Sequence, residues 1–317
     1  MTSASRWTVL RVDEATLAAE DVLVIALTDP RGEALERWEP GAHIDIRLPD
    51  GEIRQYSLCG DPDDLGSWRI AVLREENGRG GSRYIHERVV AGTEIAVGQP
   101  RNNFPLVDGA SYRLLAGGIG LTPFLPMIRE LARRGADWRL YYGGRARARM
   151  AFLPELADHP DRVHILPEDT HGLLPVAQVV DELDTESRLY CCGPEGLLDA
   201  AEKAFAARGV GSLHLERFRP RPQDEDAEQR AFEVLLAGSG RLVKVRAGQS
   251  LLDALDRAGL DVPSSCREGT CASCETPVLA GEVDHRDSVL TDDERASNAT
   301  MMICVSRARS ERLTLDL

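Results

Sequence analysis

Short runs rich in β-branched and aromatic residues recur through the first third of the chain, and no long helical repeat separates them. Turn-forming residues lie between the runs, and this spacing is typical of a small antiparallel barrel. The predicted strands of the barrel span residues 7–12, 22–27, 43–48, 53–58, 68–73 and 94–97.

From residue 112 the pattern changes, and strand-like segments alternate with helix-like segments. This alternation predicts a doubly wound α/β domain with a parallel sheet. The predicted strands are 112–116, 139–142, 162–166, 188–192 and 212–218, and the predicted helices are 122–134, 149–157, 174–183 and 195–208.

Residues 220–230 are rich in proline, glutamine and acidic residues and contain almost nothing apolar, which indicates a linker. The segment after them opens with a hairpin over 232–236 and 242–246, followed by a helix at 250–258. A chain of 317 residues exceeds what one core usually holds. We therefore divide it into a barrel (1–107), an α/β domain (108–222), a linker (223–231) and a C-terminal domain (232–317).

The formal net charge of −14 argues against nucleic acid or an anionic membrane surface as a partner, because both would repel this field. No apolar stretch approaches the length of a membrane span. The chain begins with no apolar signal segment and has seven cysteines, an odd number, so we expect free thiols and a cytoplasmic protein.

Four cysteines near the C-terminus have the spacing C-x4-C-x2-C followed by a distant fourth: Cys266, Cys271, Cys274 and Cys304. This is the spacing of a plant-type [2Fe-2S] site. Small residues between the first three let the backbone wrap closely around a cluster and direct N–H groups at its sulfurs. A structural zinc site is the alternative, but zinc ribbons usually carry two C-x2-C pairs and this segment has one.

Two motifs of the predicted barrel suit a flavin. Residues 54–58, Arg-Gln-Tyr-Ser-Leu, place a cation, an aromatic ring and a hydroxyl on one strand, as the phosphate, ring and ring edge of a flavin require. Residues 78–82, Gly-Arg-Gly-Gly-Ser, precede a predicted helix at 83–90, and such a loop at a helix N-terminus binds phosphate readily. Tyrosine in a barrel strand is more often a core residue, so the flavin prediction rests on both motifs together.

Two turns of the α/β domain suit a dinucleotide. Residues 116–123, Ala-Gly-Gly-Ile-Gly-Leu-Thr-Pro, follow its first strand, and Thr122 is predicted to cap the next helix with Pro123 at its first position. A pyrophosphate would fit there, although the turn lacks the G-x-G-x-x-G fingerprint and a tight strand–helix connection is the alternative. Residues 191–195, Cys-Cys-Gly-Pro-Glu, end the fourth strand at the carboxyl edge of the sheet, where ligands bind. A buried cysteine pair is the alternative there.

The order of these motifs resembles the phthalate dioxygenase reductase and vanillate demethylase reductase family over essentially the whole chain. The resemblance implies FMN in an antiparallel flavin-binding barrel, NADH in the parallel-sheet domain, and a β-grasp plant-type ferredoxin domain with one [2Fe-2S] cluster. It implies hydride transfer to the flavin and single electrons to a terminal oxygenase, so we name no catalytic acid or base. Further segments that carry the resemblance are 100–106, 216–218, 262–266, 284–287, 304–308 and 315–317.

The resemblance also implies roles for single residues. The flavin would contact Arg54, Tyr56, Ser57, Leu58, Ala71, Val72, Leu73, Gly80, Gly81 and Ser82, with Glu216 and Phe218 beside its ring. The nicotinamide nucleotide would contact Gly118, Thr122 and Cys192, and the four C-terminal cysteines would hold the cluster.

Three arginines depart from the family pattern. Arg145, Arg147 and Arg149 follow the second strand of the α/β domain, where the ribose end of the cofactor should lie. Arginines there could accept a 2′-phosphate, which leaves NADPH open as the electron donor, whereas a solvated basic face is the alternative.

The favoured electron acceptor is a Rieske-type terminal oxygenase. A cytochrome P450 is the alternative within the same chemistry, and a non-enzymatic redox sensor is the alternative of a different class. The acceptor is another chain, so its identity and substrate lie outside what these residues specify.

Overall fold

A computed structural model describes residues 7–76, 78–221 and 229–317. The chain divides into two compact units, Met1–Glu216 and Arg217–Leu317. The predicted barrel and α/β domain together make up nearly all of the first unit, so the boundary between them near residue 107 stays a prediction. Residues 223–228 of the predicted linker, 223–231, lie outside the described residues.

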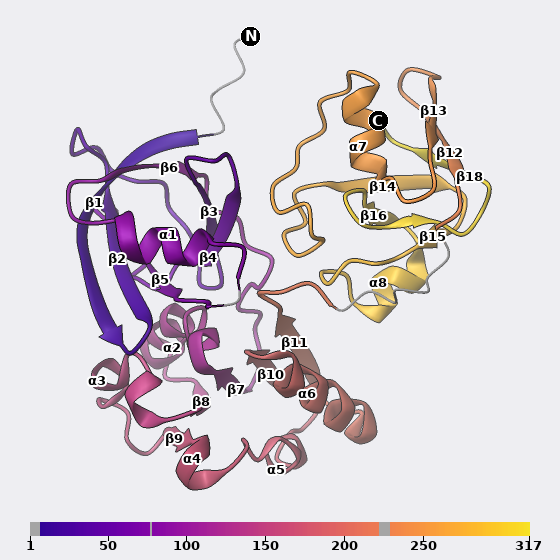
Figure 1. Cartoon of the computed structure of the whole chain (residues 1–317). Coiled ribbons are helices and arrows are strands. Elements are labelled where there is room, and N and C mark those ends of the chain that lie inside the picture. The colour runs from indigo at the N-terminus through magenta and orange to yellow at the C-terminus, as the bar shows by residue number, and fades with distance from the viewer. Residues whose placement is uncertain (1–6, 77, 222–228) are drawn as a thin grey trace. The chain divides into compact units, whose positions relative to one another are not determined.

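The first part of unit 1 is an antiparallel barrel, as the sequence predicts (Figure 1). Its strands lie side by side in the order β4-β3-β6-β1-β2-β5, and a bridge between Leu58 and Ile70 joins the end of β4 to β5. Fully buried side chains such as Leu10, Ile25 and Ile44 fill the interior. The bounds are β1 Trp7–Ala19, β2 Val22–Thr28, β3 His43–Arg47, β4 Ile53–Ser57, β5 Trp68–Leu73, α1 Gly81–Arg88 and β6 Glu94–Gly98.

Strand β1 is longer than predicted. It pairs with the whole of β2 through register shifts after Val12 and Leu17. In its second half, after Val12, the side chains are exposed or only half-buried. Backbone pairing rather than side-chain burial therefore extends this strand.

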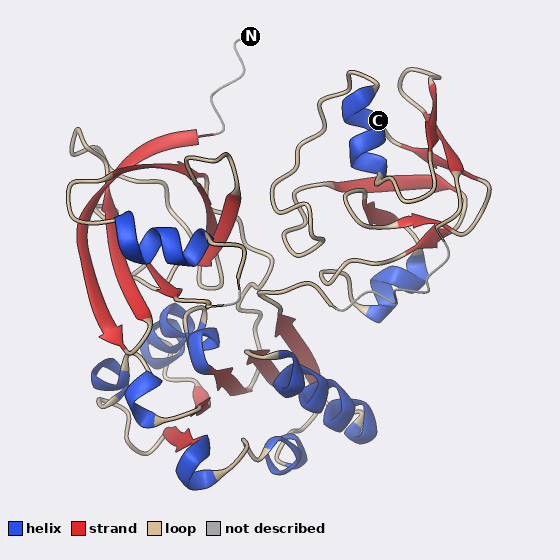
Figure 2. Cartoon of the chain, viewed as in Figure 1, coloured by secondary structure: helices blue, strands red, loops and turns tan. Residues whose placement is uncertain are grey.

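The second part of unit 1 is a five-stranded, all-parallel sheet in the order β11-β10-β7-β8-β9, which confirms the predicted doubly wound architecture. Helices line this sheet, whereas strands dominate the barrel (Figure 2). The strands are β7 Ser111–Gly117, β8 Asp137–Gly144, β9 Val163–Pro167, β10 Ser187–Cys192 and β11 Ser212–Glu216. The helices are η1 Gly118–Leu121, α2 Phe124–Arg133, η2 Arg147–Arg149, α3 Leu153–Leu156, α4 Glu168–His171, α5 Val176–Asp181 and α6 Glu195–Arg208.

The helix predicted over 149–157 is wrong as one element. The structure has a 3₁₀ turn, η2, and a separate single turn, α3. Phe152 between them adopts a left-handed conformation with φ 62°, which an α-helix does not accommodate. The ring of Phe152 is buried in the core, so tertiary packing determines this backbone.

Aromatic and polar contacts fix the barrel against the parallel sheet. The Tyr190 hydroxyl donates to the Pro105 carbonyl at 2.8 Å and accepts from the Val107 N–H at 2.8 Å. The Phe104 ring meets the Tyr190 ring edge-on, with centroids 5.2 Å apart. These contacts place the end of β4 near the carboxyl edge of the parallel sheet.

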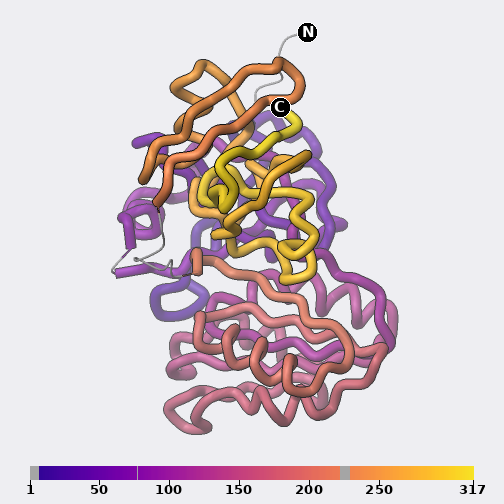
Figure 3. Tube along the Cα trace, turned by 90° about the vertical axis from the view of Figure 1, so that its right-hand side faces the viewer, coloured from indigo at the N-terminus to yellow at the C-terminus, as the bar shows by residue number. Residues whose placement is uncertain are grey.

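Unit 2 is a mixed sheet with a helix packed on it, which confirms the predicted β-grasp fold. The strand order is β13-β12-β18-β14-β16, and the first and last strands of the unit, β12 and β18, pair in parallel. The backbone of this unit is the orange and yellow part of the trace in Figure 3. Ser250 caps α7 by accepting the Asp253 N–H at 3.0 Å. The elements are β12 Phe232–Leu236, β13 Leu242–Val245, α7 Leu251–Arg257, β14 Glu275–Ala280, β15 Val283–Asp284, α8 Asp292–Ser297, β16 Thr300–Met302, β17 Arg307–Ala308 and β18 Arg312–Leu315.

None of the helices in the described part of the chain is both long enough and apolar enough to cross a bilayer.

Candidate functional site

The carboxyl ends of three strands meet at the point where the parallel sheet reverses its winding. From β7 the chain crosses to β8 on one side, whereas β10 is followed by β11 on the other. Ala116, Cys192 and Glu216 are paired in register across β7, β10 and β11. Ligands of open α/β sheets bind at such a switch point, so this edge is the candidate site of unit 1.

Glycines let the turns after β7 and β10 touch each other. A Cβ atom on Gly120 would lie 2.2 Å from the Cys192 carbonyl oxygen, and one on Gly117 would lie 2.5 Å from Pro194 Cδ. Gly118 has φ +56°, a conformation that favours glycine. The local structure therefore requires glycine at all three positions of the motif, Gly117, Gly118 and Gly120. No atom lies within 4 Å of a Cβ on Gly118, so a nucleotide would have room to approach there.

The predicted capping role of Thr122 is wrong. Its hydroxyl donates to the Ile119 carbonyl at 2.9 Å and so closes the 3₁₀ turn η1. Helix α2 starts at Phe124 with Pro123 in the cap position and no side-chain cap. Thr122 is buried, so its side chain stabilises the turn from within.

Three polar side chains meet at this edge: Ser57 from β4 and Cys192 from β10, which are buried, and Glu216 from β11, which is half-buried. The Cys192 thiol lies 3.8 Å from Glu216 Oε2, and burial raises the pKa of Glu216 to about 8, so this carboxyl is mostly protonated at pH 7. Burial and the neighbouring Glu216 raise the pKa of Cys192 well above its usual value, which keeps the thiol neutral.

The Ser57 hydroxyl is the member of this group that lacks a hydrogen-bond partner among the described residues. It lies close enough to Glu216 to offset part of the rise in that pKa, yet within the described residues it makes no hydrogen bond of normal geometry. A buried hydroxyl without a partner is costly and rare. The residues therefore fit a ligand with hydrogen-bonding atoms on the edge of its ring, as a flavin has.

The raised pKa of Glu216 predicts how the stability of the flavin-free protein depends on pH. The folded state holds this proton up to about pH 8, whereas the unfolded chain loses it near 4.5. The protonated Glu216 therefore makes its full contribution to the free energy of unfolding below pH 4.5. That contribution is lost as the pH rises towards 8, and the loss is at most several kcal/mol.

We expect Glu216→Gln, which keeps a neutral side chain of the same shape, to remove that loss. Melting temperatures of the two flavin-free proteins at pH 5 and pH 9 measure it. The wild type should fall further than the variant between the two pH values, and equal falls would refute the assignment.

The predicted phosphate loop forms a cradle at the N-terminus of α1. Gly80 holds the cap position with φ 92° and the helix has no side-chain cap, so its first N–H groups are available for an anion. The Arg54 side chain packs on Gly81, where a Cβ atom would lie 2.6 Å from its Nε. Ser82 faces the same loop, because its hydroxyl accepts the Glu75 N–H at 3.0 Å. A cation and free helix N–H groups together fit one phosphate.

The other predicted flavin residues differ in how deeply they are buried. Tyr56 is half-buried against the barrel core, and its burial raises the pKa of its hydroxyl. Leu58 and Val72 are fully buried in that core, so a ligand would reach their backbone rather than their side chains. Ala71 is also buried and Leu73 is half-buried. Phe218 belongs to unit 2, where 43% of its surface is exposed.

The three arginines after β8 do not act as one cluster. Arg149 makes ion pairs with Glu20 and Asp21 of the barrel, each at 3.4 Å. Arg145 and Arg147 are exposed, and no ion pair is found for either among the described residues. Only these two remain as candidates for contacting a cofactor phosphate.

In unit 2 the structure brings the four predicted cysteines together. Cys266 contacts Cys271 and Cys304, and Cys274 contacts Cys304, and these thiol–thiol contacts hold the pKa of Cys266 and Cys274 below the usual range. Backbone N–H groups of Glu268 and Thr270 point at the Cys266 sulfur at 3.3 and 3.5 Å. N–H groups directed at sulfur stabilise thiolate charge, which is what an iron–sulfur cluster requires of its loop.

The cysteine loop has a constrained backbone. Of the five described non-glycine residues with positive φ, two lie here, Arg267 at 57° and Ala272 at 54°. Arg267 is held by ion pairs to Asp253 and Asp256 of α7, at 3.2 and 2.8 Å. Within the described residues, no three His, Cys, Asp or Glu side chains are grouped as a site for a single metal ion.

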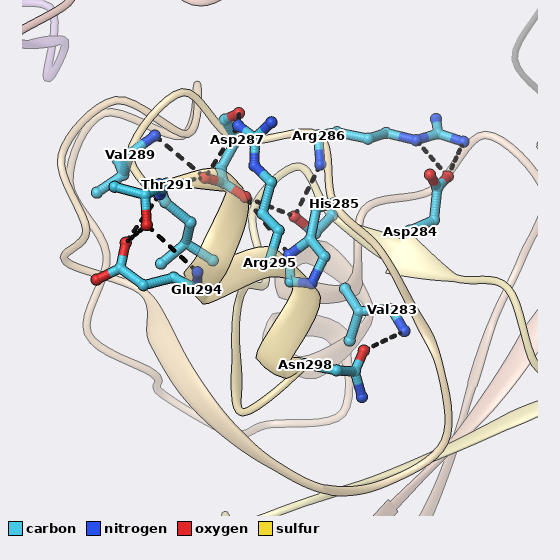
Figure 4. A network of polar contacts seen from close by, with 12 residues as sticks. Val283, Asp284, His285, Arg286, Asp287, Val289, Thr291, Glu294, Arg295 and Asn298 are labelled. Atoms are coloured by element: carbon cyan, nitrogen blue, oxygen red, sulfur yellow. Dashed lines mark hydrogen bonds and ion pairs between the residues drawn. The ribbon is translucent and has the colours of Figure 1, made fainter. Parts of the chain in front are cut away.

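A buried carboxylate, Asp287, joins the two segments that carry the cysteines. Figure 4 shows its hydrogen bonds within residues 283–298. Asp287 is 1% exposed, and its Oδ2 accepts the Val289 and Leu290 N–H groups at 3.1 and 2.8 Å. Its backbone packs on Gly269 of the cysteine loop, where a Cβ atom would lie 3.1 Å from Asp287 Cα. The Ser306 hydroxyl, two residues after Cys304, lies 3.5 Å from Asp287 Oδ1.

This supporting role of Asp287 was not predicted. The segment 284–287 stands out in the sequence only through the family resemblance. Its contacts join residues far apart in the chain, so spacing alone gives no signal of them.

Comparisons with known proteins find relatives for each of the two units. The family model described as the 2Fe-2S iron-sulfur cluster binding domain matches residues 234–309. The chain is 43% identical over 310 residues to the phenoxybenzoate dioxygenase subunit beta of Ectopseudomonas oleovorans, covering 97% of each chain.

Two solved structures resemble the whole chain. The structure of phthalate dioxygenase reductase, described as a modular structure for electron transfer from pyridine nucleotides to [2Fe-2S], matches with a TM-score of 0.71 and 38% identity, covering 98% of each chain. An intact type IV self-sufficient cytochrome P450 monooxygenase matches with a TM-score of 0.91 and 42% identity over 98% of this chain. The chain spans 41% of the length of that P450 protein.

Proposed function

The chain belongs to the phthalate dioxygenase reductase family, and we propose that it carries electrons from NADH through FMN and one [2Fe-2S] cluster to a Rieske-type terminal oxygenase. The observation that carries the proposal is the cysteine loop, where four thiols gather beneath directed backbone N–H groups. An oxygenase reductase combines such an iron–sulfur electron carrier with a nucleotide-binding α/β sheet on one chain. This chain has the cysteine loop for the first and the switch point of the parallel sheet for the second.

The residues of unit 1 would hold the flavin at the edge shared by the barrel and the parallel sheet. Arg54 and the N-terminus of α1 would bind its phosphate, and Ser57 would hydrogen bond to its ring edge. A bound flavin accepts a hydride and releases its electrons one at a time. The half-buried Glu216 and the buried Cys192, both neutral, would order the ring and nicotinamide without placing a net charge beside them.

FMN is proposed rather than FAD because the phosphate cradle ends on one helix. The loop with Gly80 and Gly81 runs directly into α1, and Arg54 packs over its first residue. A single terminal phosphate satisfies this site, and no further loop among the described residues around α1 is evident for an adenylate.

We expect NADH to exceed NADPH in kcat/KM. The discriminating residues are Arg145 and Arg147, because Arg149 is occupied by Glu20 and Asp21. Arg145→Ala/Arg147→Ala should lower kcat/KM for NADPH by about tenfold or more and leave kcat/KM for NADH unchanged, because only NADPH has the 2′-phosphate that these arginines would contact. Arg149→Ala is the matched control, and higher kcat/KM for NADPH than for NADH in the wild type would contradict the proposed donor.

A cytochrome P450 is the second candidate acceptor. It is favoured by the resemblance to an intact self-sufficient cytochrome P450 monooxygenase, of whose chain this protein spans 41%. The relatives named as subunits of dioxygenase systems, including the phenoxybenzoate dioxygenase subunit, favour the Rieske-type acceptor.

Purification and reconstitution test the proposal. Anaerobically purified protein should contain flavin and about two irons per flavin, and heat-released flavin should comigrate with FMN. The oxygenase encoded nearest to this chain should turn over with NADH only when this protein is added. Zinc in place of iron, FAD as the released flavin, or turnover by a P450 and not by a Rieske-type oxygenase would each overturn the corresponding part.

A further inference from the structure

A groove with a basic lining lies between the edge strand β13 and helix α7 of unit 2. Its volume is about 270 Å³, and no acidic residue lines it. Four cations surround a floor of small and apolar side chains: Arg241, Lys244, Arg246 and Arg257. This is unusual in a chain whose net charge is −14.

Most cations of residues 232–317 outside the groove are neutralised, with the exposed Arg309 as the exception, whereas those of the groove are largely left without an ion pair among the described residues. Residues 232–317 contain ten lysines and arginines. Outside the groove, Arg267, Arg286, Arg295 and Arg312 each make ion pairs, and Arg307 is buried on backbone carbonyls.

Inside the groove the pairing is sparse. Within the described residues no ion pair is found for Arg241, Arg246 or Arg257, and Lys244 reaches Glu233 only at 3.9 Å. That Glu233 is also bound by Arg312 at 2.6 Å, so it offers little neutralisation. Unpaired cations gathered in one hollow attract an anionic partner.

The groove has the form of a docking surface rather than of a small-molecule pocket. Strand β13 is the outermost strand of its sheet and pairs only with β12 among the described strands. Leu242 and Lys244 point outward from it, and Leu242 is 42% exposed between the cations. An exposed leucine surrounded by positive charge fits a protein surface with apolar and acidic groups side by side.

The groove also lies close to the cysteine loop. Helix α7 lines it with Ala254 and Arg257, while Asp253 and Asp256 of the same helix hold Arg267 of the cysteine loop. One helix, about 10 Å across, therefore separates the groove from the loop. A protein seated on this end of unit 2 can contact both.

We propose that the groove between β13 and α7 docks an acidic segment of the protein that accepts electrons from the cluster, an inference that rests on the proposed reductase function. The four cations would draw the acceptor in and set its orientation, which places its electron entry over the cysteine loop. Charge of this kind acts mainly on association and orientation.

Charge reversal in the holoprotein tests the proposal. Arg241→Glu/Arg257→Glu should weaken binding of a fluorescein-labelled decaglutamate peptide by about tenfold or more, and should raise the KM for the oxygenase identified by reconstitution to a similar degree. NADH oxidation with ferricyanide and the iron content should stay at wild-type values. Arg309→Glu is the matched control, since it reverses an exposed cation of the same unit outside the groove.

The outcomes separate the two proposals. Loss of peptide binding and a raised KM in the groove variant, with Arg309→Glu unaffected, support docking at the groove. Equal effects of both reversals, no effect of the groove variant, or no peptide binding by the wild type would overturn it. If the wild type drives no oxygenase, the proposed reductase function fails, while the peptide measurement still decides whether the groove selects acidic segments.

Discussion

Replacing Cys304 with serine should abolish oxygenase-coupled turnover while NADH oxidation with ferricyanide continues. Cys304 is 7% exposed and contacts Cys266 and Cys274, so it completes the four-thiol group. A hydroxyl replaces a thiolate ligand poorly, and the cluster should be lost or severely destabilised. Ferricyanide accepts electrons directly from a reduced flavin, so unit 1 should still serve it. We expect the oxygenase-coupled rate to fall by about 100-fold or more.

Iron analysis, the visible spectrum and the two steady-state rates measure this effect. Cys59→Ala is the matched control, because Cys59 is a buried cysteine of the barrel outside the four-thiol group. The control should keep its iron and both activities. Full oxygenase turnover by an iron-free Cys304→Ser protein would show that the cluster is not on the electron path.

A chain shortened to end near Arg221 should behave similarly. The first compact unit ends at Glu216 and contains all of the proposed flavin contacts except Phe218. We expect such a protein to retain flavin and ferricyanide reduction and to fail with the oxygenase and with cytochrome c.

Replacing Gly120 with alanine should remove most of the reactivity with NADH. The new Cβ atom would lie 2.2 Å from the Cys192 carbonyl oxygen, a backbone atom that cannot move without displacing the turn after β10. The nicotinamide would then lose its place against the flavin, and a small misplacement of reacting groups costs about 100-fold in rate. Flavin should be retained, because Arg54 and the N-terminus of α1, which would hold its phosphate, lie outside this turn. The cluster should be retained because its cysteines belong to the other unit.

Stopped-flow reduction of the flavin by NADH measures the loss, and reduction by dithionite shows that the flavin itself is intact. Gly196→Ala is the matched control, because no atom lies within 4 Å of the Cβ it would add in α6. A wild-type rate of reduction by NADH in Gly120→Ala would mean that the nicotinamide binds elsewhere.

The sequence was sufficient for the elements that local pattern and spacing determine. The order of strand-like and helix-like segments predicted the parallel sheet, and the C-x4-C-x2-C spacing predicted which thiols would gather. Features that depend on contacts distant in the chain were not predictable in this way. The break at Phe152 arises from packing of its ring in the core, and the Asp287 contacts join segments that only the fold brings together.

Thr122 and Glu216 show the same limit at single residues. The position of Thr122 before Pro123 is that of a helix cap, but the extra 3₁₀ turn η1 takes its hydroxyl. Glu216 looks like an ordinary surface carboxylate in the sequence, and only its partial burial at the edge of the assembled sheet raises its pKa to about 8. Burial is a property of the assembled unit, so no local pattern specifies it.

The central claim is that the cluster relays electrons from the flavin to the oxygenase. Freeze-quench EPR of the intact protein, mixed anaerobically with NADH and then with oxidised oxygenase, follows this relay directly. The account predicts that the signal of the reduced [2Fe-2S] cluster appears after flavin reduction and decays as the oxygenase is reduced. Reduction of the oxygenase while the cluster stays oxidised throughout, or a reduced cluster whose signal persists when oxygenase is added, would contradict it.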